Sequence, residues 1–330
     1  MFISVKSGNT IDSGPDLTYF SVMTEHTVRR VVIAGGTGFL GQSLSRHLTH
    51  QGVQVTVVSR RQPANNIAGR WIQWDGRSSG TWEASLDGAD AVVNLAGRTV
   101  DCRKTPDRCD EILRSRVESV LTLGEAIRQC DNPPSVWVQG ATAHIYGDPP
   151  NRICDESTPS GYGLAPYVGR RWEEAFAQAC PPGIRSVVLR TSFVLGATGG
   201  ALPILARLAR LGLGGSIGSG RQWISWLHAH DMNRIIERAI DEPSMQGVYN
   251  ATAPSAATNQ QFMRALRQVA RRPIGLPTPG WLVRLGAKTL IDTDPEIVLY
   301  GRNCVPKRLL DEGYRFAFPS LSKALADLLS

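Results

Sequence analysis

The chain has 330 residues, of which 42% are hydrophobic and 20% are charged, and its formal net charge at pH 7 is +7. This composition is typical of a globular protein and excludes an intrinsically disordered one, and the length allows one large domain or two unequal ones. The basic residues are scattered without a long Lys/Arg tract, so we expect no nucleic-acid partner and infer instead a basic pocket for a phosphate-bearing ligand.

The cysteines and the first residues bear on the compartment. None of the 6 cysteines forms a Cys-x-x-Cys pair, which favours free thiols in a reducing environment. No apolar run reaches the roughly 18 residues of a membrane span. Residues 1–27 lack the pattern of a secretory signal and are interpreted as a loose extension, with Met23 as an alternative start. We therefore expect a cytoplasmic protein that does not enter a membrane.

From Arg29 onward, short apolar runs alternate with helical stretches. Strands are expected at 31–34, 53–58, 91–94, 136–138 and 186–189. Helices are expected between them at 40–50, 107–130 and 167–179. Continuous apolar strands that are separated by helices predict a parallel sheet covered on both faces. We therefore expect an α/β fold, a Rossmann-type doubly wound sheet over residues 28–195.

The pattern changes after Gly196. A glycine-rich stretch at 212–220 is followed by an aromatic run, and a helix is expected to begin at Asp231 with that residue as its N-cap. Further helices are expected near 259–270 and 281–290, and the tail 305–329 has helical spacing around Tyr314–Phe316. Residues 196–330 are thus expected to form a smaller α-rich substrate domain, with some chain returning to the Rossmann core.

Three glycines at a spacing of three residues follow the first strand and open the first helix. They are Gly35, Gly38 and Gly41. In such a turn the first glycine allows a tight bend, the second lets the backbone approach a pyrophosphate, and the third lets helix and strand pack closely, while the helix N-terminus presents free N–H groups to the negative charge. The turn therefore predicts a dinucleotide site made by Gly35, Thr37, Gly38, Phe39, Leu40 and Gly41.

The second strand ends in Ser59, Arg60 and Arg61. Folds that bind NAD usually carry an acidic residue here, which accepts hydrogen bonds from the adenosine ribose 2′-OH. Hydroxyl and guanidinium groups suit a 2′-phosphate instead, because arginine binds phosphate through paired donors. We therefore predict NADP(H) as the cofactor. A solvated loop without a ligand is the alternative interpretation of the two arginines.

The strand expected at 91–94 runs into Asn94, Leu95, Ala96 and Gly97. Small residues at the carboxyl end of a strand let a cofactor lie against the backbone, at the edge where open α/β sheets bind ligands. We therefore add these four residues to the predicted cofactor site. A tight exit from the strand is the alternative explanation for them.

Together these motifs resemble the extended short-chain dehydrogenase/reductase family. The segment His-Ile-Tyr-Gly-Asp at 144–148 resembles the same family. Later segments resemble the family's "NAD-dependent epimerase/dehydratase, epimerase family protein" subgroup, which has its own C-terminal domain. These segments are 199–203, 218–223, 226–228, 250–254 and 305–310. The resemblance extends from about Arg29 to the C-terminus and implies hydride chemistry at a nicotinamide cofactor.

The resemblance also implies catalytic positions. The family uses Asn, Ser, Tyr and Lys, and its Ser position falls here on Thr142 and its Tyr-x-x-x-Lys on Tyr167 and Arg171, while its Asn position falls near Arg116. Thr142 keeps the hydroxyl. The charge of Arg171 would lower the pKa of Tyr167, but arginine cannot readily pass a proton. The alternatives are an ordinary tyrosine, and an arginine paired with a following glutamate at the surface.

Arg221, Gln222 and His228 lie where extended family members contact substrate. A buried, hydrogen-bonded histidine is an equally good interpretation of His228, and neither it nor His230 has further ligand spacing, so we predict no metal. The sequence thus favours an NADP(H)-dependent oxidoreductase or epimerase that acts on a small molecule, with sugar-linked and nucleotide-linked compounds as the candidate classes. We expect a monomer or a homodimer. The rival hypothesis is an NADP(H)-binding redox sensor or regulatory protein without turnover.

Overall fold

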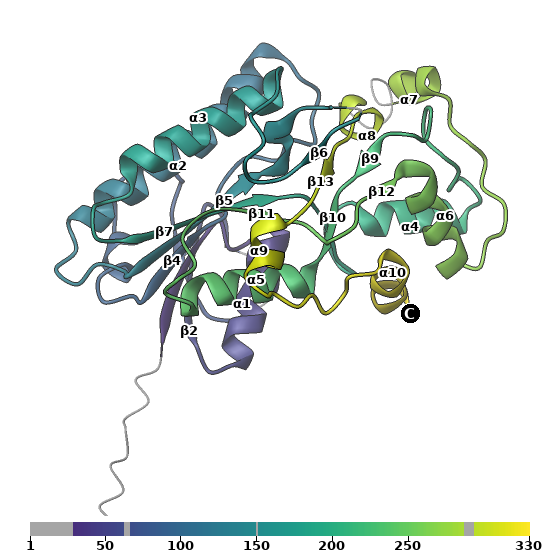
Figure 1. The fold of residues 1–330 in the computed structure, drawn as a ribbon. Coiled ribbons are helices and arrows are strands. Elements are labelled where there is room, and N and C mark those ends of the chain that lie inside the picture. Colours follow the sequence, from purple (N-terminus) through teal and green to yellow (C-terminus); the bar gives the residue numbers. More distant parts are fainter. Residues whose placement is uncertain (1–28, 63–66, 150, 287–293) are drawn as a thin grey trace, which may run out of the picture.

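The computed structural model describes residues 29–62, 67–149, 151–286 and 294–330. Within this part of the chain lies a seven-stranded sheet of order β11-β7-β5-β4-β1-β2-β3, whose neighbouring strands are all parallel (Figure 1). Its strands are β1 (Arg30–Ala34), β2 (Gln54–Ser59), β3 (Arg70–Gln73), β4 (Ala91–Asn94), β5 (Val136–Thr142), β7 (Arg185–Thr191) and β11 (Gly247–Ala251). The expected Rossmann-type α/β sheet is confirmed.

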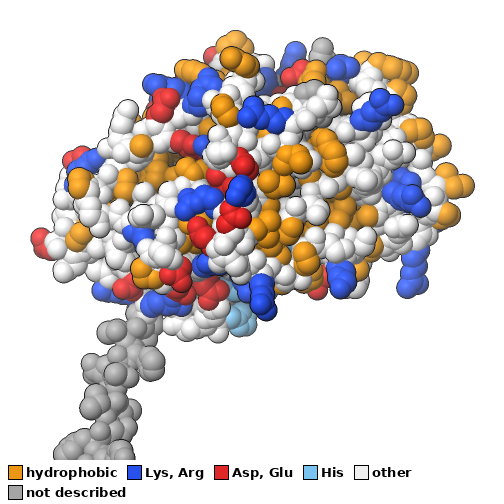
Figure 2. All heavy atoms as spheres, in the orientation of Figure 1, with side chains coloured by type: hydrophobic (Ala, Val, Ile, Leu, Met, Phe, Trp, Pro, Cys, Tyr) orange, Lys and Arg blue, Asp and Glu red, His pale blue; other side chains and the backbone are white. Residues whose placement is uncertain are grey.

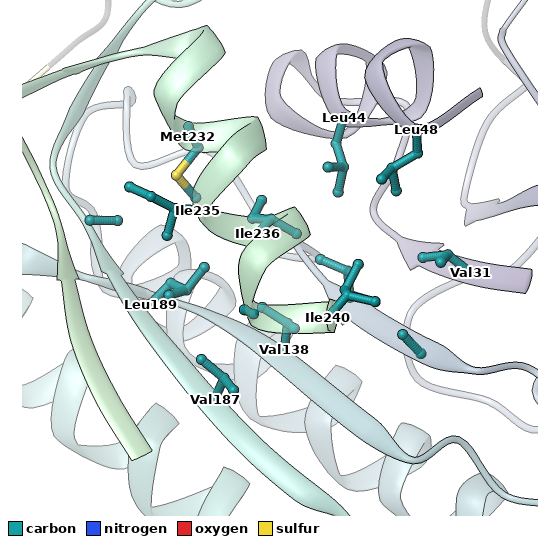
Figure 3. Packing of buried hydrophobic residues seen from close by; sticks show 14 of the residues in the cluster. Val31, Leu44, Leu48, Val138, Val187, Leu189, Met232, Ile235, Ile236 and Ile240 are labelled. Atoms are coloured by element: carbon teal, nitrogen blue, oxygen red, sulfur yellow. The ribbon is translucent and has the colours of Figure 1, made fainter. Parts of the chain in front are cut away.

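Helices cover both faces of the sheet because successive side chains of a buried strand point to opposite sides. Helices α1 (Phe39–His50) and α5 (Ala229–Asp241) lie on one face, and α2 (Pro106–Arg128) and α3 (Leu164–Ala179) lie on the other (Figure 1). On β1, Val31 and Ile33 join the core with α1 and α5, whereas Val32 joins the core with α2 and α3. Figure 3 shows the first of these cores, which is built from aliphatic side chains of both helices and the strands between them. Burial of each such side chain contributes about 1.5–3 kcal/mol.

The other half of the chain packs around a separate hydrophobic cluster. Helices α4 (Leu202–Arg210), α6 (Asn259–Val269) and α10 (Leu321–Leu329) enclose it. Three two-stranded sheets accompany it. In them β8 (Phe193–Leu195) pairs with β10 (Trp226–His228), β9 (Trp223–Ile224) with β12 (Ala257–Thr258), and β6 (Ile153–Cys154), from the first half, with β13 (Asn303–Cys304). Helices α7 (Gly280–Gly286) and α8 (Glu296–Leu299) lie beside them. Helix α5 and strand β11 come from this half of the sequence but belong to the Rossmann-type layer, α5 as a covering helix and β11 as an edge strand. The two halves of the chain are therefore interleaved in the structure.

Asp231 is not an N-cap, contrary to the sequence-based expectation. Helix α5 begins two residues earlier, and its N-cap is His228, whose Nδ1 accepts a hydrogen bond from the N–H of His230 at 3.0 Å. The Asp231 carboxylate is fully buried and accepts hydrogen bonds from the N–H groups of Ala317 and Phe318 at 2.8 and 2.9 Å. The carboxylate therefore anchors the C-terminal segment across α5, a long-range partner that local spacing does not reveal.

Tyr314–Phe316 are not helical either, which corrects a second expectation. Helix α9 (Lys307–Asp311) ends just before Gly313, whose φ of 73° places it in the left-handed region. The chain then runs irregularly over α5, where the Tyr314 ring lies 5.7 Å from the Arg234 guanidinium, before α10 begins. The regular spacing of apolar residues there reflects packing on α5 and does not reflect a helix.

Some expectations concern residues outside those that the structure describes. The expected extension at 1–27, with Met23, lies wholly outside them, and so does the second half of the helix expected at 281–290. In the described ranges, none of the helices is both long enough and apolar enough to cross a membrane. On the face shown in Figure 2, basic side chains are interspersed with acidic and uncharged ones.

Candidate cofactor and substrate site

The glycine turn between β1 and α1 is closely packed against the exit of β4. Gly35 has a φ of 74°, and a Cβ on it would lie 2.7 Å from the backbone of Ala96. A Cβ on Gly41 would lie 2.3 Å from the Cα of Gly36, so helix α1 approaches its own turn as closely as backbone allows. A Cβ on Gly38 would meet only the carbonyl oxygen of Gly35, at an ordinary 3.5 Å. The turn is therefore tight on its inner side and open at Gly38.

Phe39, at the first position of α1, connects the turn to the other half of the molecule. A Cβ on Gly196 would lie 2.3 Å from the Phe39 ring, and one on Gly199 would lie 2.4 Å from it. The ring therefore rests on the loop that leads from β8 to α4. Leu40 is partly buried and packs on the core with Phe39, and the Thr37 carbonyl accepts a hydrogen bond from Gln42 at 2.7 Å. The side chains of Phe39 and Leu40 are thus packed inward, which leaves the backbone of the turn to meet a ligand.

At the exit of β2, the hydroxyl of Ser59 is engaged within the protein. Its Oγ donates to the carbonyl of Arg61 at 3.1 Å and accepts from Nε1 of Trp71 at 2.9 Å. Ser59 therefore shapes the turn that presents the two arginines. The side chains of Arg60 and Arg61 are exposed, and within the described residues neither forms an ion pair with a carboxylate. Both guanidinium groups are thus open to a ligand.

The exit of β4 is held by a buried amide pair that sequence reasoning did not identify. Asn94 is fully buried, and its Nδ2 donates to Oε1 of Gln139 at 3.0 Å while its Oδ1 accepts from the N–H of Ala96 at 3.0 Å. The N–H of Leu95 donates to the carbonyl of Ala34 at 2.8 Å. Asn94 thus bends the strand exit against the glycine turn. A polar residue in the middle of a buried strand, such as Gln139, was the available signal.

Arg116 lies beside Gly97, where a Cβ on the glycine would be 3.3 Å from the guanidinium carbon. Its guanidinium stacks over Trp172 at 5.0 Å and donates to the carbonyl of Ile112 at 2.9 Å. Burial lowers the pKa of Arg116 to about 10. Since no carboxylate of the described residues pairs with it, a positive charge stands at the exit of β4 at the position where the family carries asparagine.

At the exit of β5, Thr142 begins a turn of 3-10 helix, η2 (Ala143–Tyr146), and its Oγ1 accepts a hydrogen bond from the N–H of His144 at 3.1 Å. The Tyr146 hydroxyl is committed elsewhere, because it donates to Oδ1 of Asn250 at 2.8 Å and accepts from Arg190 at 2.9 Å. Burial raises the pKa of Tyr146 to about 12. Tyr146 therefore serves the packing of η2, and the Thr142 hydroxyl keeps its own proton for a further bond.

Helix α3 turns its glycine, and not Tyr167 or Arg171, toward η2. A Cβ on Gly169 would lie 3.1 Å from the Cβ of Ile145. At about 100° per residue, Tyr167 and Arg171 each lie about 200° around the helix from Gly169. Tyr167 is 46% exposed, and Arg171 donates to Glu174 at 2.8 Å. Arg171 is thus paired as in the surface alternative that the sequence left open, and the role of Tyr167 as acid/base stays a prediction.

Glu173, two residues after Arg171, has a more consequential partner. Glu173 receives two hydrogen bonds from Arg190, from Nε and Nη2, each at 2.8 Å. Burial opposes charge on Arg190, but its bonds to Glu173 outweigh burial and raise the pKa of Arg190. Because Arg190 also donates to the Tyr146 hydroxyl, this ion pair fixes α3 relative to η2 and β7. Sequence reasoning weighed Glu173 only as a surface partner of Arg171.

The three predicted substrate residues do not share one environment. His228 is buried, lies 3.3 Å from Asp327 and stacks on Phe318 at 3.9 Å between ring centres. Its role here is to cap α5 and to pack under α10, and burial lowers its pKa. Nε2 of Gln222 donates to the carbonyl of Ile217 at 2.9 Å. Only the Arg221 side chain is exposed.

Residues 301–304 connect the second half of the chain to the exit of β5. The N–H of Gly301 donates to Asp148 at 2.8 Å, and Nε of Arg302 donates to the carbonyl of Gly147 at 2.9 Å. On the other side, the Ser225 hydroxyl donates to the carbonyl of Arg302 at 2.8 Å. The β9–β10 region is thereby held beside the loop after η2, at the edge of the sheet where open α/β folds bind ligands.

Two further features of the site follow from the chemistry of the side chains. In the part of the chain that the structure describes, no three His, Cys, Asp or Glu side chains are grouped as metal ligands. The six cysteines have free thiols there. The groups gathered around the edge of β4 and β5 are instead backbone N–H groups, one hydroxyl, one imidazole and several guanidinium groups, which suit phosphate and polar organic ligands.

Comparisons with known proteins agree with this geometry. A model described as "NAD dependent epimerase/dehydratase family" matches residues 31–252, and one described as "Domain of unknown function (DUF1731)" matches residues 278–328. Human epimerase family protein SDR39U1 is 34% identical over 307 residues, which are 91% of this chain and 100% of that protein. Epimerase family protein YfhF of Bacillus subtilis is 30% identical over 304 residues, 91% of this chain and 98% of that protein.

Solved structures show the same likeness. The crystal structure of human epimerase family protein SDR39U1 (isoform2) with NADPH has a TM-score of 0.81 at 33% identity and covers 91% of this chain and 99% of that one. The nucleoside-diphosphate sugar epimerase from Corynebacterium glutamicum has a TM-score of 0.73 at 28% identity, over 92% of this chain and 58% of that one. The resemblance seen in the sequence motifs is confirmed: this chain belongs to the NAD dependent epimerase/dehydratase family, within the extended short-chain dehydrogenases/reductases that carry their own C-terminal domain.

Proposed function

We propose that this protein is an NADP(H)-dependent oxidoreductase or epimerase that acts on a hydroxyl or ketone group of a small molecule. The observation that carries the proposal is the glycine turn, which meets the exit of β4 with no room for a Cβ on Gly35 and is open at Gly38. Its likeness to a human relative crystallised with NADPH supports the proposal. The bound cofactor would supply or accept the hydride.

Each part of the edge would have a distinct task in cofactor binding. The backbone of Gly35–Gly41, at the N-terminus of α1, would hold the pyrophosphate through N–H groups. Arg60 and Arg61 would hold the 2′-phosphate. The backbone at the exit of β4, from Asn94 to Gly97, would lie against the cofactor. The Thr142 hydroxyl, which still has a hydrogen to donate, would orient the oxygen of the substrate.

The group that moves the proton is less directly supported. The family resemblance implies Tyr167 as acid/base with Arg171 as its electrostatic partner. The Tyr167 side chain is 46% exposed and so accessible to a ligand, whereas Arg171 is bonded to Glu174. We keep Tyr167 as a candidate that one substitution can decide, and Thr142 and His144 are the side chains nearest the exit of β5 that carry a dissociable proton.

The rival function, NADP(H) binding without turnover, has one specific observation in its favour. The positions at which the family carries Asn and Lys fall here on Arg116 and Arg171, and arginine cannot readily transfer a proton. A protein that reports the NADP(H) redox state needs the cofactor site but no acid/base on this helix. Turnover of some carbonyl compound with NADPH would exclude this alternative.

The test of the proposed function has two stages. NADPH and NADH are first titrated against the full chain, with tryptophan fluorescence or calorimetry as the readout, and we expect NADPH to bind at least tenfold more tightly. A panel of hydroxyl and carbonyl compounds is then screened with the cofactor, and absorbance of the reduced nicotinamide is followed. Failure of both cofactors to bind would refute the proposal, whereas binding without turnover over a broad panel would favour the sensor.

A further inference from the structure

Arg302 has hydrogen-bond donors that the protein does not use. It lies in the segment that joins the second half of the chain to the loop after η2, and its Nε donates to the carbonyl of Gly147 at 2.9 Å. A guanidinium has five N–H donors, of which four are on the two terminal nitrogens. Within the described residues, these terminal nitrogens have no hydrogen-bond partner, and no carboxylate lies within ion-pair distance of them. These nitrogens are not among the buried atoms left without a partner, so they are accessible from outside the protein and can bind a ligand.

The nearest carboxylate is oriented toward another group. Oδ1 of Asp148 accepts a hydrogen bond from the N–H of Gly301 at 2.8 Å. Gly301 immediately precedes Arg302 in the chain. The same two contacts hold Arg302 in place, because Gly301 and Arg302 are both bonded to the turn at 147–148. The guanidinium is therefore fixed by its Nε and by its backbone, while its terminal face is free. This is the arrangement in which arginine binds a planar or tetrahedral oxyanion through two parallel bonds.

His144 stands at the same turn. Its carbonyl accepts the N–H of Gly147 at 3.1 Å, and it comes two residues after Thr142. Burial, together with the charges of Arg302 and Lys104, holds the pKa of His144 well below its ordinary value. The imidazole is therefore neutral and adds no charge of its own, and no hydrogen bond joins its ring to a described residue. One ring N–H is available to a ligand beside the guanidinium.

Lys104 is the other cation near this imidazole, but its donors are used. Its Nζ donates to the carbonyls of Val100 and Cys102 and pairs with Asp294 at 3.5 Å. Lys104 thus contributes positive potential that is already partly balanced by a carboxylate, whereas Arg302 contributes both charge and open donors. The site that remains consists of the Arg302 fork and the His144 ring, next to the Thr142 hydroxyl.

We propose that Arg302 and His144 form a subsite for an oxyanion of the substrate, so that the substrate is a hydroxyl or carbonyl compound that also bears a carboxylate or phosphate group. This inference rests on the proposed function for the reacting end of the substrate, at Thr142. The anion would be held by two N–H groups of Arg302 and one of His144. Such a subsite would place the oxygen of the substrate by anchoring the other end of a short molecule.

The test measures anion binding without cofactor, so that it is independent of the NADP(H) proposal. Inorganic phosphate and acetate are titrated separately against the full chain, and two quantities are followed: the ring NMR signals of His144 and the thermal midpoint of unfolding. We expect one or both anions to shift the His144 signals saturably and to raise the midpoint. Binding of phosphate alone assigns a phosphate-bearing substrate, and binding of acetate alone assigns a carboxylate.

Three variants locate the anion. Arg302→Gln should weaken the anion-dependent shift of the His144 signals at least tenfold. Arg267→Gln is the matched control, because Arg267 is also half-buried and also donates to a backbone carbonyl, that of Gly214 at 2.6 Å, in the other half of the molecule; it should bind as the unaltered protein does. Arg60→Ala detects phosphate that binds at the predicted cofactor site. Such binding would be lost in Arg60→Ala and kept in Arg302→Gln.

Two results would overturn the subsite. One is that neither anion moves the His144 signals of the unaltered protein, a result that needs no variant and so stands even if Arg302→Gln does not fold. The other is equal binding by Arg302→Gln and Arg267→Gln. If anions bind at Arg302 but neither NADPH nor NADH binds, the subsite is supported and the proposed function alone fails.

Discussion

Gly35 and Ala96 meet backbone to backbone: a Cβ added to Gly35 would lie 2.7 Å from both Cα and N of Ala96. This contact joins the turn after β1 to the exit of β4. The two motifs were separate signals in the sequence, and the contact shows that they form one surface at the carboxyl edge of adjacent parallel strands.

Gly35→Ala should destabilise the protein and abolish cofactor binding. The left-handed backbone at φ 74° costs about 1–2 kcal/mol for alanine, and the clash with Ala96 adds about 1–3 kcal/mol of overpacking. Gly52→Ala is the control, because Gly52 has a φ of 79° but nothing lies within 4 Å of its Cβ position. Urea unfolding of both variants separates the two contributions, and equal losses of stability would show that the contact with Ala96 is unimportant.

Arg60→Ala should weaken NADPH and leave NADH nearly unchanged. Loss of one charge-assisted hydrogen bond to the 2′-phosphate costs about 1.5–3 kcal/mol, which corresponds to roughly 10- to 150-fold in affinity. Arg207→Ala, which removes an exposed guanidinium from α4, serves as the control and should bind both cofactors normally. A parallel loss for both cofactors in Arg60→Ala would mean that this residue does not read the 2′-phosphate.

Tyr167→Phe decides whether the tyrosine is the acid/base. Since Arg171 is bonded to Glu174 and is not the electrostatic partner of the phenol, we expect the variant to bind cofactor and to retain most of the turnover of the unaltered enzyme. Phenylalanine keeps the ring and removes the dissociable oxygen, so packing is conserved. A fall in turnover by a hundredfold or more, with cofactor affinity unchanged, would restore the assignment implied by the family.

Glu173→Ala and Glu174→Ala should differ strongly although the residues are neighbours. Glu173 forms two bonds with the largely buried Arg190, and removing one partner of such a pair costs about 3–5 kcal/mol. Glu174 pairs with the exposed Arg171, and an exposed pair contributes about 0–1 kcal/mol. Chemical unfolding of the two variants measures the difference. Similar stabilities would contradict the role given to the Glu173–Arg190 pair.

Stability should fall as the pH drops below about 6.5, because of His144. The folded-state pKa of His144 lies well below the ordinary histidine value of about 6.5, so the unfolded chain binds the proton more readily than the folded chain does. The stabilisation is therefore fully present above the unfolded pKa and is lost as the pH falls below it, with a slope of up to about 1.4 kcal/mol per pH unit for one proton.

Urea unfolding at pH 7.5 and 5.5 measures this loss. His144→Gln should reduce the dependence on pH without removing it, since burial also lowers the pKa of His228 and acts in the same direction. An unchanged difference between the two pH values in His144→Gln would show that His144 is not buried as a neutral imidazole.

The architecture could be predicted wherever the cause is local. Apolar runs such as Ala91–Asn94 become buried strands because only apolar side chains suit a sheet covered on both faces. Glycines at 35, 38 and 41 indicate a close turn, because Gly35 has a left-handed φ of 74° and a Cβ on Gly41 would lie 2.3 Å from Gly36. The parallel sheet and the family followed from these signals. The boundaries were less certain, because α3 begins at Leu164, after Gly163, and not at Tyr167.

The sequence by itself determined which motifs this protein carries, because spacing along the chain reflects the local periods of helices and strands. Only the tertiary structure decided which side chains meet. Asp231 anchors the backbone at 317–318 instead of capping a helix, Glu173 takes Arg190 from the adjoining strand, and Arg302 reaches the turn at Gly147 from 155 positions away. A hydrogen-bonding side chain takes the partner that burial brings to it, and burial is set by the packing of distant segments.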